Sequence, residues 1–178
     1  MRKIWIEMKR IGWLLLMMVW ACWSPAQSDV ALESFGSAFL TGLVSKDIEN
    51  LRPLMVSESD ARATMADIDL AQADIDQEMA IFNEASGRMQ ANFQASFDLA
   101  MEAIKDFAVE DIAFVKIERE RPSRHPNIEK CDLLLYFNVR KKKFFIDVDD
   151  CVHTVNGWGF TSKFEVLPVE PASKSKQD

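Results

Sequence analysis

The chain has 178 residues, of which 48% are hydrophobic and 28% charged, and 28 acidic against 21 basic residues give a net charge of −7. This apolar fraction suffices for one sizeable core and excludes wholesale disorder, a collagen-like repeat and a multi-span membrane protein. The acidic balance argues against a general nucleic-acid binder, which needs a basic face against phosphates.

Residues 1–26 have the pattern of a bacterial signal peptide. Four basic residues among the first ten precede an apolar run from Ile11 to Ala21. As a helix this run would span roughly 16 Å, whereas a bilayer core needs about 20 apolar residues. A cleaved signal peptide is therefore expected, with an uncleaved membrane anchor as the alternative. Cleavage after Ala26 removes four bases and one acid, which leaves a mature net charge of −10.

A second interpretation falls on the same segment. Val19-Trp20-Ala21-Cys22 resembles the lipobox of bacterial lipoproteins, in which the cysteine is lipidated and becomes the N-terminus. The sequence therefore predicts an exported protein, periplasmic or extracellular, with a lipid-anchored membrane lipoprotein as the alternative. Contact with a membrane is expected only through the signal peptide or a lipid at Cys22.

The spacing of apolar residues predicts helices over the first half of the mature chain. Ser28-Asp29 is expected to cap a helix that ends near Ser45, and Asp47 to cap a short helix. Ser57–Asp60 opens a longer helical stretch.

A heptad-like apolar stripe follows. Its members are Ile68, Ile75, Met79, Phe82, Met89, Phe93, Phe97, Ala100, Ile104 and Phe107. One straight rod of this length would span roughly 60 Å, so a break is expected at Ala85-Ser86-Gly87, where glycine costs about 1 kcal/mol. One long helix is the alternative. The stripe is interpreted as core packing, with a partner-binding surface as the alternative.

After Phe107 the apolar period changes from 3.6 to 2, which predicts strands. The expected strands are 112–117, 131–139, 144–155 and 158–166, with a polar loop over 118–130. Asn156-Gly157 predicts a type I′ hairpin turn, and residues 168–178 a polar tail. The order indicates a single α+β domain over residues 27–167, with N-terminal helices packed on a curved four-stranded antiparallel sheet.

Two segments resemble NTF2-like (cystatin-like α+β) domains. SFGSAFLTGLVSKDIENLRPLM (34–55) is similar to the first helices of that superfamily, and FFIDVDDCVHTVNGWGFTSKFEV (144–166) to its last hairpin. The resemblance extends to small secreted or lipid-anchored bacterial proteins of unassigned role. It implies a curved sheet wrapped on helices, often with a pocket at the wide end, and no particular reaction.

Two cysteines remain after export, Cys131 and Cys151. An oxidising compartment allows a bridge between them. In a regular ladder they would lie on opposite faces of the sheet, but a bulge at Asp149-Asp150 would bring them to one face. A disulfide is predicted, with two separate thiols as the alternative.

The two histidines and an acidic cluster are the candidates for chemistry. His153 with Asp147 is a candidate acid–base pair, although a hydrogen-bonded or surface histidine is the simpler interpretation; His125 is expected in a loop. Carboxylates that could hold a hard cation occur at Asp132, Asp147, Asp149 and Asp150. They lack a loop with fixed ligand spacing, so an exposed acidic face is expected, with no metal and no cofactor.

The resulting prediction is a non-enzymatic exported domain that binds a small ligand or a protein partner, and no nucleic acid. Aromatic residues offer a large contact area, and the expected lining is Phe114, Tyr136, Trp158 and Phe160. The alternatives are an NTF2-fold enzyme that uses His153 and Asp147, and a helical adaptor or chaperone-like protein that uses the apolar stripe.

Overall fold

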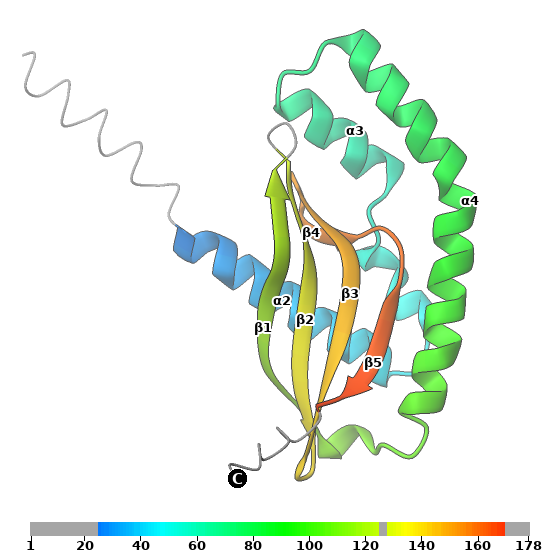
Figure 1. The fold of residues 1–178 in the computed structure, drawn as a ribbon, viewed down its shortest axis with the longest axis vertical. Helices are drawn as coiled ribbons and strands as arrows, with labels where there is room; N and C mark the ends of the chain where they lie inside the picture. The colour runs from blue at the N-terminus through cyan, green and yellow to red at the C-terminus, as the bar shows by residue number, and fades with distance from the viewer. Residues whose placement is uncertain (1–24, 125–127, 170–178) are drawn as a thin grey trace, which may run out of the picture.

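Helices occupy the first half of the chain and strands the second. The computed structural model describes residues 25–124 and 128–169. Its helices and 3₁₀ turns are α2 (Pro25–Val44), η1 (Ile48–Asn50), η2 (Arg52–Leu54), α3 (Glu58–Asp67), α4 (Gln72–Ala103) and η3 (Val109–Asp111). Its strands are β1 (Ile112–Arg124), β2 (Glu129–Val139), β3 (Lys142–Thr154), β4 (Gly157–Phe160) and β5 (Phe164–Pro168). The predicted α+β class is confirmed, with a long helix beside an antiparallel sheet (Figure 1).

The sheet is an open antiparallel meander. β1, β2 and β3 follow one another, and both β4 and β5 pair with the remaining edge of β3. β4 pairs with Cys151–Thr154 and β5 with Phe144–Val148, so the two short strands lie end to end. Residues 161–163 interrupt what the sequence predicted as one strand, and the sheet has five strands rather than four.

The main core lies between the sheet and α2, which crosses behind the strands in Figure 1. We call this side of the sheet the inner face; it carries the buried Leu133, Leu135, Phe137, Ile146 and Val148. The opposite side is the outer face. Phe39 of α2 is fully buried, and its ring centroid lies 5.3 Å from that of Phe160 and 5.1 Å from that of Phe164. Aromatic packing therefore joins α2 to β4 and β5.

The helix α4 runs unbroken for 32 residues, so the predicted break at Gly87 is wrong. A Cβ built on Gly87 would meet open space, and only the propensity cost of about 1 kcal/mol opposes the helix there. Packing on both sides outweighs this cost. Met79 packs against α3 in a smaller cluster, whereas Phe93 belongs to the main core.

The chain reverses between α3 and α4 instead. Asp69 adopts a left-handed φ of 59° in this connection, a conformation that Asp tolerates better than most residues. Most of the apolar stripe is buried, and the chain's own core uses it as predicted; the buried members are Ile75, Met79, Phe93, Phe97, Ala100 and Ile104.

β1 is longer than the sequence predicted. It continues from Ile112 to Arg124, through much of the segment expected as a polar loop. Lys116–Glu120 keep regular register with β2. Pro122 lies in a register shift of the edge strand β1, between Glu120 and Ser123, where it has no partner on β2, so its missing N–H removes no ladder hydrogen bond. A polar composition alone is therefore not sufficient to assign this segment to a loop.

The β3–β4 hairpin is confirmed, but its turn lies one residue earlier than predicted. Thr154 pairs with Gly157, so the two-residue loop is Val155-Asn156. Only Gly157, with φ of 114°, adopts a positive φ here, which excludes the type I′ turn. Thr154 Oγ1 donates to the Gly157 carbonyl (2.8 Å) and accepts from the Asn156 N–H (3.2 Å). The threonine side chain thus closes the turn.

The predicted cap at Asp47 and the predicted helix start at Ser57–Asp60 are confirmed. The predicted cap at Ser28-Asp29 is wrong, because α2 already begins at Pro25. The Asp47 carboxylate accepts from the Glu49 N–H at 3.0 Å, and Ser57 forms a capping box with Asp60 at the start of α3. Asp60 also accepts from Asn156 Nδ2 at 2.7 Å. The α3 cap therefore holds the β3–β4 hairpin as well.

The predicted signal peptide up to residue 24, Cys22 and His125 lie outside the described residues. Ala26 lies in the first turn of α2. At the other end, Pro168 belongs to β5 and the Val169 N–H donates to the Lys143 carbonyl at 3.0 Å, so the sheet extends past the predicted start of the tail. Within the described ranges, none of the helices combines the length and apolar character needed to cross a bilayer.

Candidate functional site

The candidate acid–base pair is not brought together. Asp147 pairs with Leu134 on the outer face, whereas the bulge that follows turns Cys151, and with it His153, to the inner face. The His153 ring lies 5.1 Å from that of Trp158, its partner across the hairpin. The sheet therefore separates the two groups that a joint acid–base role requires.

The four aromatics expected to line one pocket also separate. Phe160 is fully buried and Trp158 nearly so, and both belong to the main core. Tyr136 lies on the outer face opposite Phe145. Phe114 lines the larger of two hollows, the groove described below, and Trp158 lines the smaller one. Sequence alternation marked these residues as large and apolar but could not tell core positions from pocket positions.

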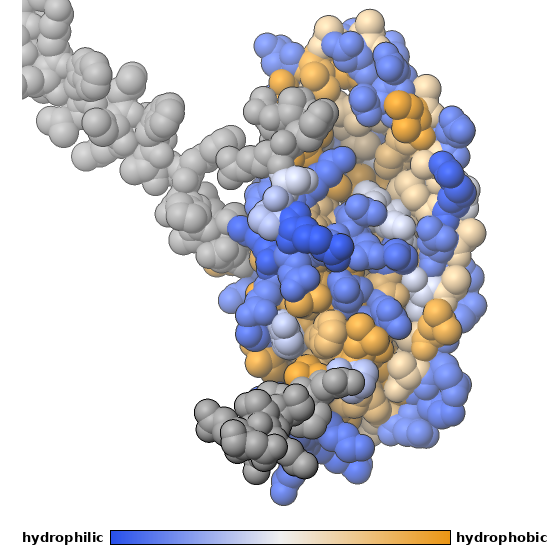
Figure 2. All heavy atoms as spheres, in the orientation of Figure 1, coloured by the Kyte–Doolittle hydropathy of each residue, from blue (hydrophilic) through white to orange (hydrophobic). Residues whose placement is uncertain are grey.

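The outer face combines an aromatic pair with charges. Tyr136 and Phe145 have centroids 5.9 Å apart, and the Lys116 amine lies 4.7 Å from the Tyr136 centroid. Burial and then a hydrogen bond to Glu118 raise the pKa of Tyr136. Figure 2 views this face, with hydrophilic side chains across its middle and apolar ones below them.

The acidic cluster on the outer face is largely paired. Asp132 bonds to Arg121 Nε at 2.7 Å, and Asp149 to Lys163 Nζ at 3.0 Å. Burial, and then the charges of Asp149 and Asp132, raise the pKa of Asp147. Among the described residues, no group of three or more His, Cys, Asp or Glu side chains is arranged to hold a metal ion.

The two cysteines are brought together. Cys131 and Cys151 are direct cross-strand partners, because β3 has one extra residue opposite β2 between this pair and Leu133–Val148. The predicted bulge at Asp149-Asp150 is thus confirmed. Both thiols are free and buried, and burial raises the pKa of Cys131 to about 12.

An open groove of about 890 Å³ follows α2 from Val30 to Ser45. Phe114 of β1 contributes an aromatic surface to it, and Asn50 lies near its other end. The residues that line it and face solvent, along α2 and at Ser45 directly after the helix, are mostly small: Ser34, Ser37, Ala38, Thr41 and Ser45. We call this surface the α2 groove.

Two of the four hydroxyls in the α2 groove are directed to the helix itself. Thr41 Oγ1 donates to the Ser37 carbonyl at 2.8 Å, and Ser45 Oγ donates to the Gly42 carbonyl at 2.6 Å. Because these hydroxyls bond to backbone, their methyl and methylene groups contribute to an apolar surface. Among the groove residues, Glu33 alone is charged.

The solvent-facing side of α4 differs in composition. Beside exposed alanines and the exposed Ile81 and Leu99, it carries many polar or charged side chains, including Asp76, Glu84, Arg88, Gln94, Asp98 and Glu102. A solvated helix surface is normally polar and charged. The low charge of the α2 groove is therefore a property of that surface and not of every helix in this chain.

Sequence reasoning missed the α2 groove. The signal was present, since small residues fall at spacings of three and four along the side of α2 opposite its apolar positions. The expected lining consisted of large aromatic residues, so these small residues were not among the candidates. Charged residues are what an ordinary solvent-facing helix would carry at those positions.

Comparisons of the chain with family models, with curated proteins and with solved structures found no match. The function is therefore inferred from the sequence, the fold and the surface.

Proposed function

We propose that this protein is a non-enzymatic, exported domain of NTF2-like type that binds a protein partner along the α2 groove. The observation that carries the proposal is the open, weakly charged groove beside a helix whose other side is fixed in the core. Export rests on the N-terminal sequence, where a basic segment precedes a short apolar run.

The shape of the α2 groove favours a polypeptide over a small molecule. Small-molecule sites usually enclose most of the ligand surface, whereas this groove is open along its length. A second hollow, near Val56, Asp60 and Gly159, has a volume of only about 70 Å³. The larger hollow thus offers a long contact surface, and the smaller one little room.

The composition of the α2 groove suits a helical segment of the partner. From Val30 to Val44, where α2 ends, the helix rises about 21 Å at 1.5 Å per residue, the length of about four turns of a partner helix. Small side chains allow close approach of two helices, and a helix docks in such a groove by its apolar face. Val30, which is 65% exposed, and Phe114 supply apolar contacts.

Site-specific photocrosslinking in the native host tests the proposal. A photoreactive residue at Ser37 in the groove is compared with one at Gln90, which is exposed on α4. We expect an adduct of discrete mass from position 37 and none from position 90. Absence of an adduct at 37, or equal adducts from both positions, would contradict binding at the groove.

A further inference from the structure

Cys131 and Cys151 occupy directly opposed positions at one end of the β2–β3 pair. Both side chains are buried on the inner face, at 3% and 0% exposure. Opposed positions in an antiparallel pair have Cα atoms about 4.5–5.5 Å apart, within the range that a disulfide spans. The backbone thus already holds the two residues at bridging distance.

The bulge beside them creates this arrangement. Asp132 of β2 faces two residues of β3, Asp149 and Asp150, and Asp150 takes a left-handed φ of 52°. Without the extra residue, Cys131 and Cys151 would fall on opposite faces of the sheet. The bulge interrupts the regular pairing of β2 and β3 and requires an unusual backbone conformation at Asp150. It also places the two thiols opposite each other.

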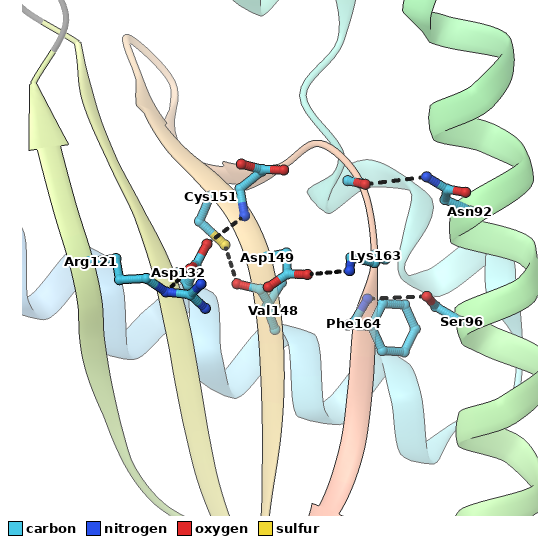
Figure 3. A network of polar contacts seen from close by, with 11 residues as sticks. Asn92, Ser96, Arg121, Asp132, Val148, Asp149, Cys151, Lys163 and Phe164 are labelled. Carbon is cyan, nitrogen blue, oxygen red and sulfur yellow. Dashed lines mark hydrogen bonds and ion pairs between the residues drawn. The ribbon is translucent and has the colours of Figure 1, made fainter.

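Side chains hold the bulge in place (Figure 3). The Asp132 carboxylate accepts from the Asp150 N–H at 2.9 Å and is itself bonded to Arg121. Thr161 Oγ1 donates to the Asp150 carbonyl at 3.0 Å. Within the described part of the chain, the Cys151 thiol makes one weak hydrogen bond, to the Val148 carbonyl at 3.5 Å, so no strong hydrogen bond there would be lost if this thiol were oxidised.

We propose that Cys131 and Cys151 form an intramolecular disulfide in the exported protein. The oxidant is a disulfide, carried by a thiol oxidoreductase or by oxidised glutathione. A thiolate of one cysteine attacks it and releases one thiol, and the second cysteine then displaces the other. The S–S bond forms, the oxidant's S–S bond breaks, and the protein's two thiol protons and two electrons end on the two released thiols. The proposal rests on the export proposed above and not on the α2 groove.

The burial of both thiols argues for a structural bridge formed during folding. Desolvation raises the pKa of Cys131 to about 12 and that of Cys151 well above its usual range. The folded dithiol therefore contains little thiolate, which is the reactive form. Catalytic and redox-sensor cysteines, by contrast, are exposed and have lowered pKa values.

Peptide mapping of the full chain tests the bridge. The reduced, denatured protein is refolded with reduced and oxidised glutathione, alkylated in denaturant without reductant, and digested with trypsin. Cleavage after lysine and arginine gives peptides 131–140 and 144–163, each with one cysteine. We expect a linked species lighter than their sum by two hydrogen atoms. Recovery of both peptides separately, each alkylated, would overturn the proposal.

A shifted cysteine provides the geometric control. In a Cys151→Ala, Val152→Cys double variant, the second thiol moves to the opposite face of β3, where the native residue pairs with Lys130. We expect no link to Cys131 in this variant under the same refolding. A link of equal yield would show that crosslinking needs no particular register, and would contradict the role assigned to the bulge.

Stability gives an independent measurement. Closing a loop of this length lowers the entropy of the unfolded chain, so the oxidised protein should melt about 6–12 °C above the reduced protein. A Cys131→Ala, Cys151→Ala variant should show no change on addition of reductant. Equal melting points for oxidised and reduced wild type would contradict a bridge that fits the native register.

Discussion

The two sides of α2 differ in residue size and in what they contact. The inner side carries large apolar residues packed on the sheet, namely Leu32, Phe35, Phe39, Leu40 and Leu43. The other side carries the small residues of the α2 groove. The same helix is thus a central part of the core on one side and an open surface on the other. Substitutions on the two sides should separate stability from binding.

Gly42 marks a boundary between these two sides. It lines the groove, yet a Cβ built on it would lie 2.8 Å from Leu51 Cδ2 and 3.0 Å from the Asn50 carbonyl oxygen. The chain after α2 therefore packs directly on the helix backbone. At Gly42, the packing of Leu51 and Asn50 against the helix therefore limits the size of the side chain.

The largest effect is expected from Phe39→Ala on the inner side. Phe39 is fully buried and its ring contacts those of Phe160 and Phe164. Its removal should lower the free energy of unfolding by about 3–5 kcal/mol, as measured by chemical denaturation. On the open side, Val30→Ala should change it by less than about 0.5 kcal/mol. Similar losses of unfolding free energy in both variants would contradict the difference between the two sides of α2.

A pair of glycine substitutions sharpens the boundary. Gly42→Ala should destabilise by about 1–3 kcal/mol, because backbone as well as the Leu51 side chain must move. Gly87→Ala, also within a helix but facing open space, should stabilise by about 0.5–1 kcal/mol. Urea denaturation of both variants checks the signs. Stabilisation by Gly42→Ala would mean that the approach of Leu51 and Asn50 is loose.

The outer face of the sheet extends the comparison, because Asp147 lies on an open face yet burial raises its pKa. Between the ordinary carboxyl pKa, about 3.9, and this raised value, the folded state binds more protons than the unfolded state. Stability therefore falls as pH rises through that window. Asp147→Asn should raise the melting temperature by about 1–2 °C at neutral pH, an effect limited by solvent screening.

The pH dependence of this effect is the control. At about pH 3 the wild-type carboxyl is protonated in both states, so the advantage of Asp147→Asn should disappear in thermal melts. A variant less stable than wild type at neutral pH would show that the ionised Asp147 is stabilised by its surroundings, opposite to the direction of its pKa shift.

Periodicity and parity were sufficient to predict much of this fold. The change of apolar period after Phe107 separated helices from strands, and strand parity predicted the bulge at Asp149-Asp150. Both arguments concern which face a side chain occupies. A shift of strand register by one residue would expose apolar side chains or bury charged ones, so the order of apolar and polar residues in a strand is tightly constrained.

Local propensity was a weaker guide where tertiary packing decides. Gly87 was expected to break α4, but its cost is small beside the packing of Phe93 and Met79 on either side. Pro122 was expected in a loop, but a bulge in the edge strand β1 accommodates it. The candidate site was less predictable, because the α2 groove is defined by small residues whose exposure depends on the whole fold.

Binding at the α2 groove is tested most directly by a matched pair of alanine substitutions. Ala38 lines the groove and Ala91 is exposed on α4. Arginine at either position should alter the free energy of unfolding by less than about 0.5 kcal/mol. The crosslinked adduct from position 37 should be lost in Ala38→Arg and retained in Ala91→Arg. An adduct that persists at full yield in Ala38→Arg would contradict the assignment of the groove as the binding surface.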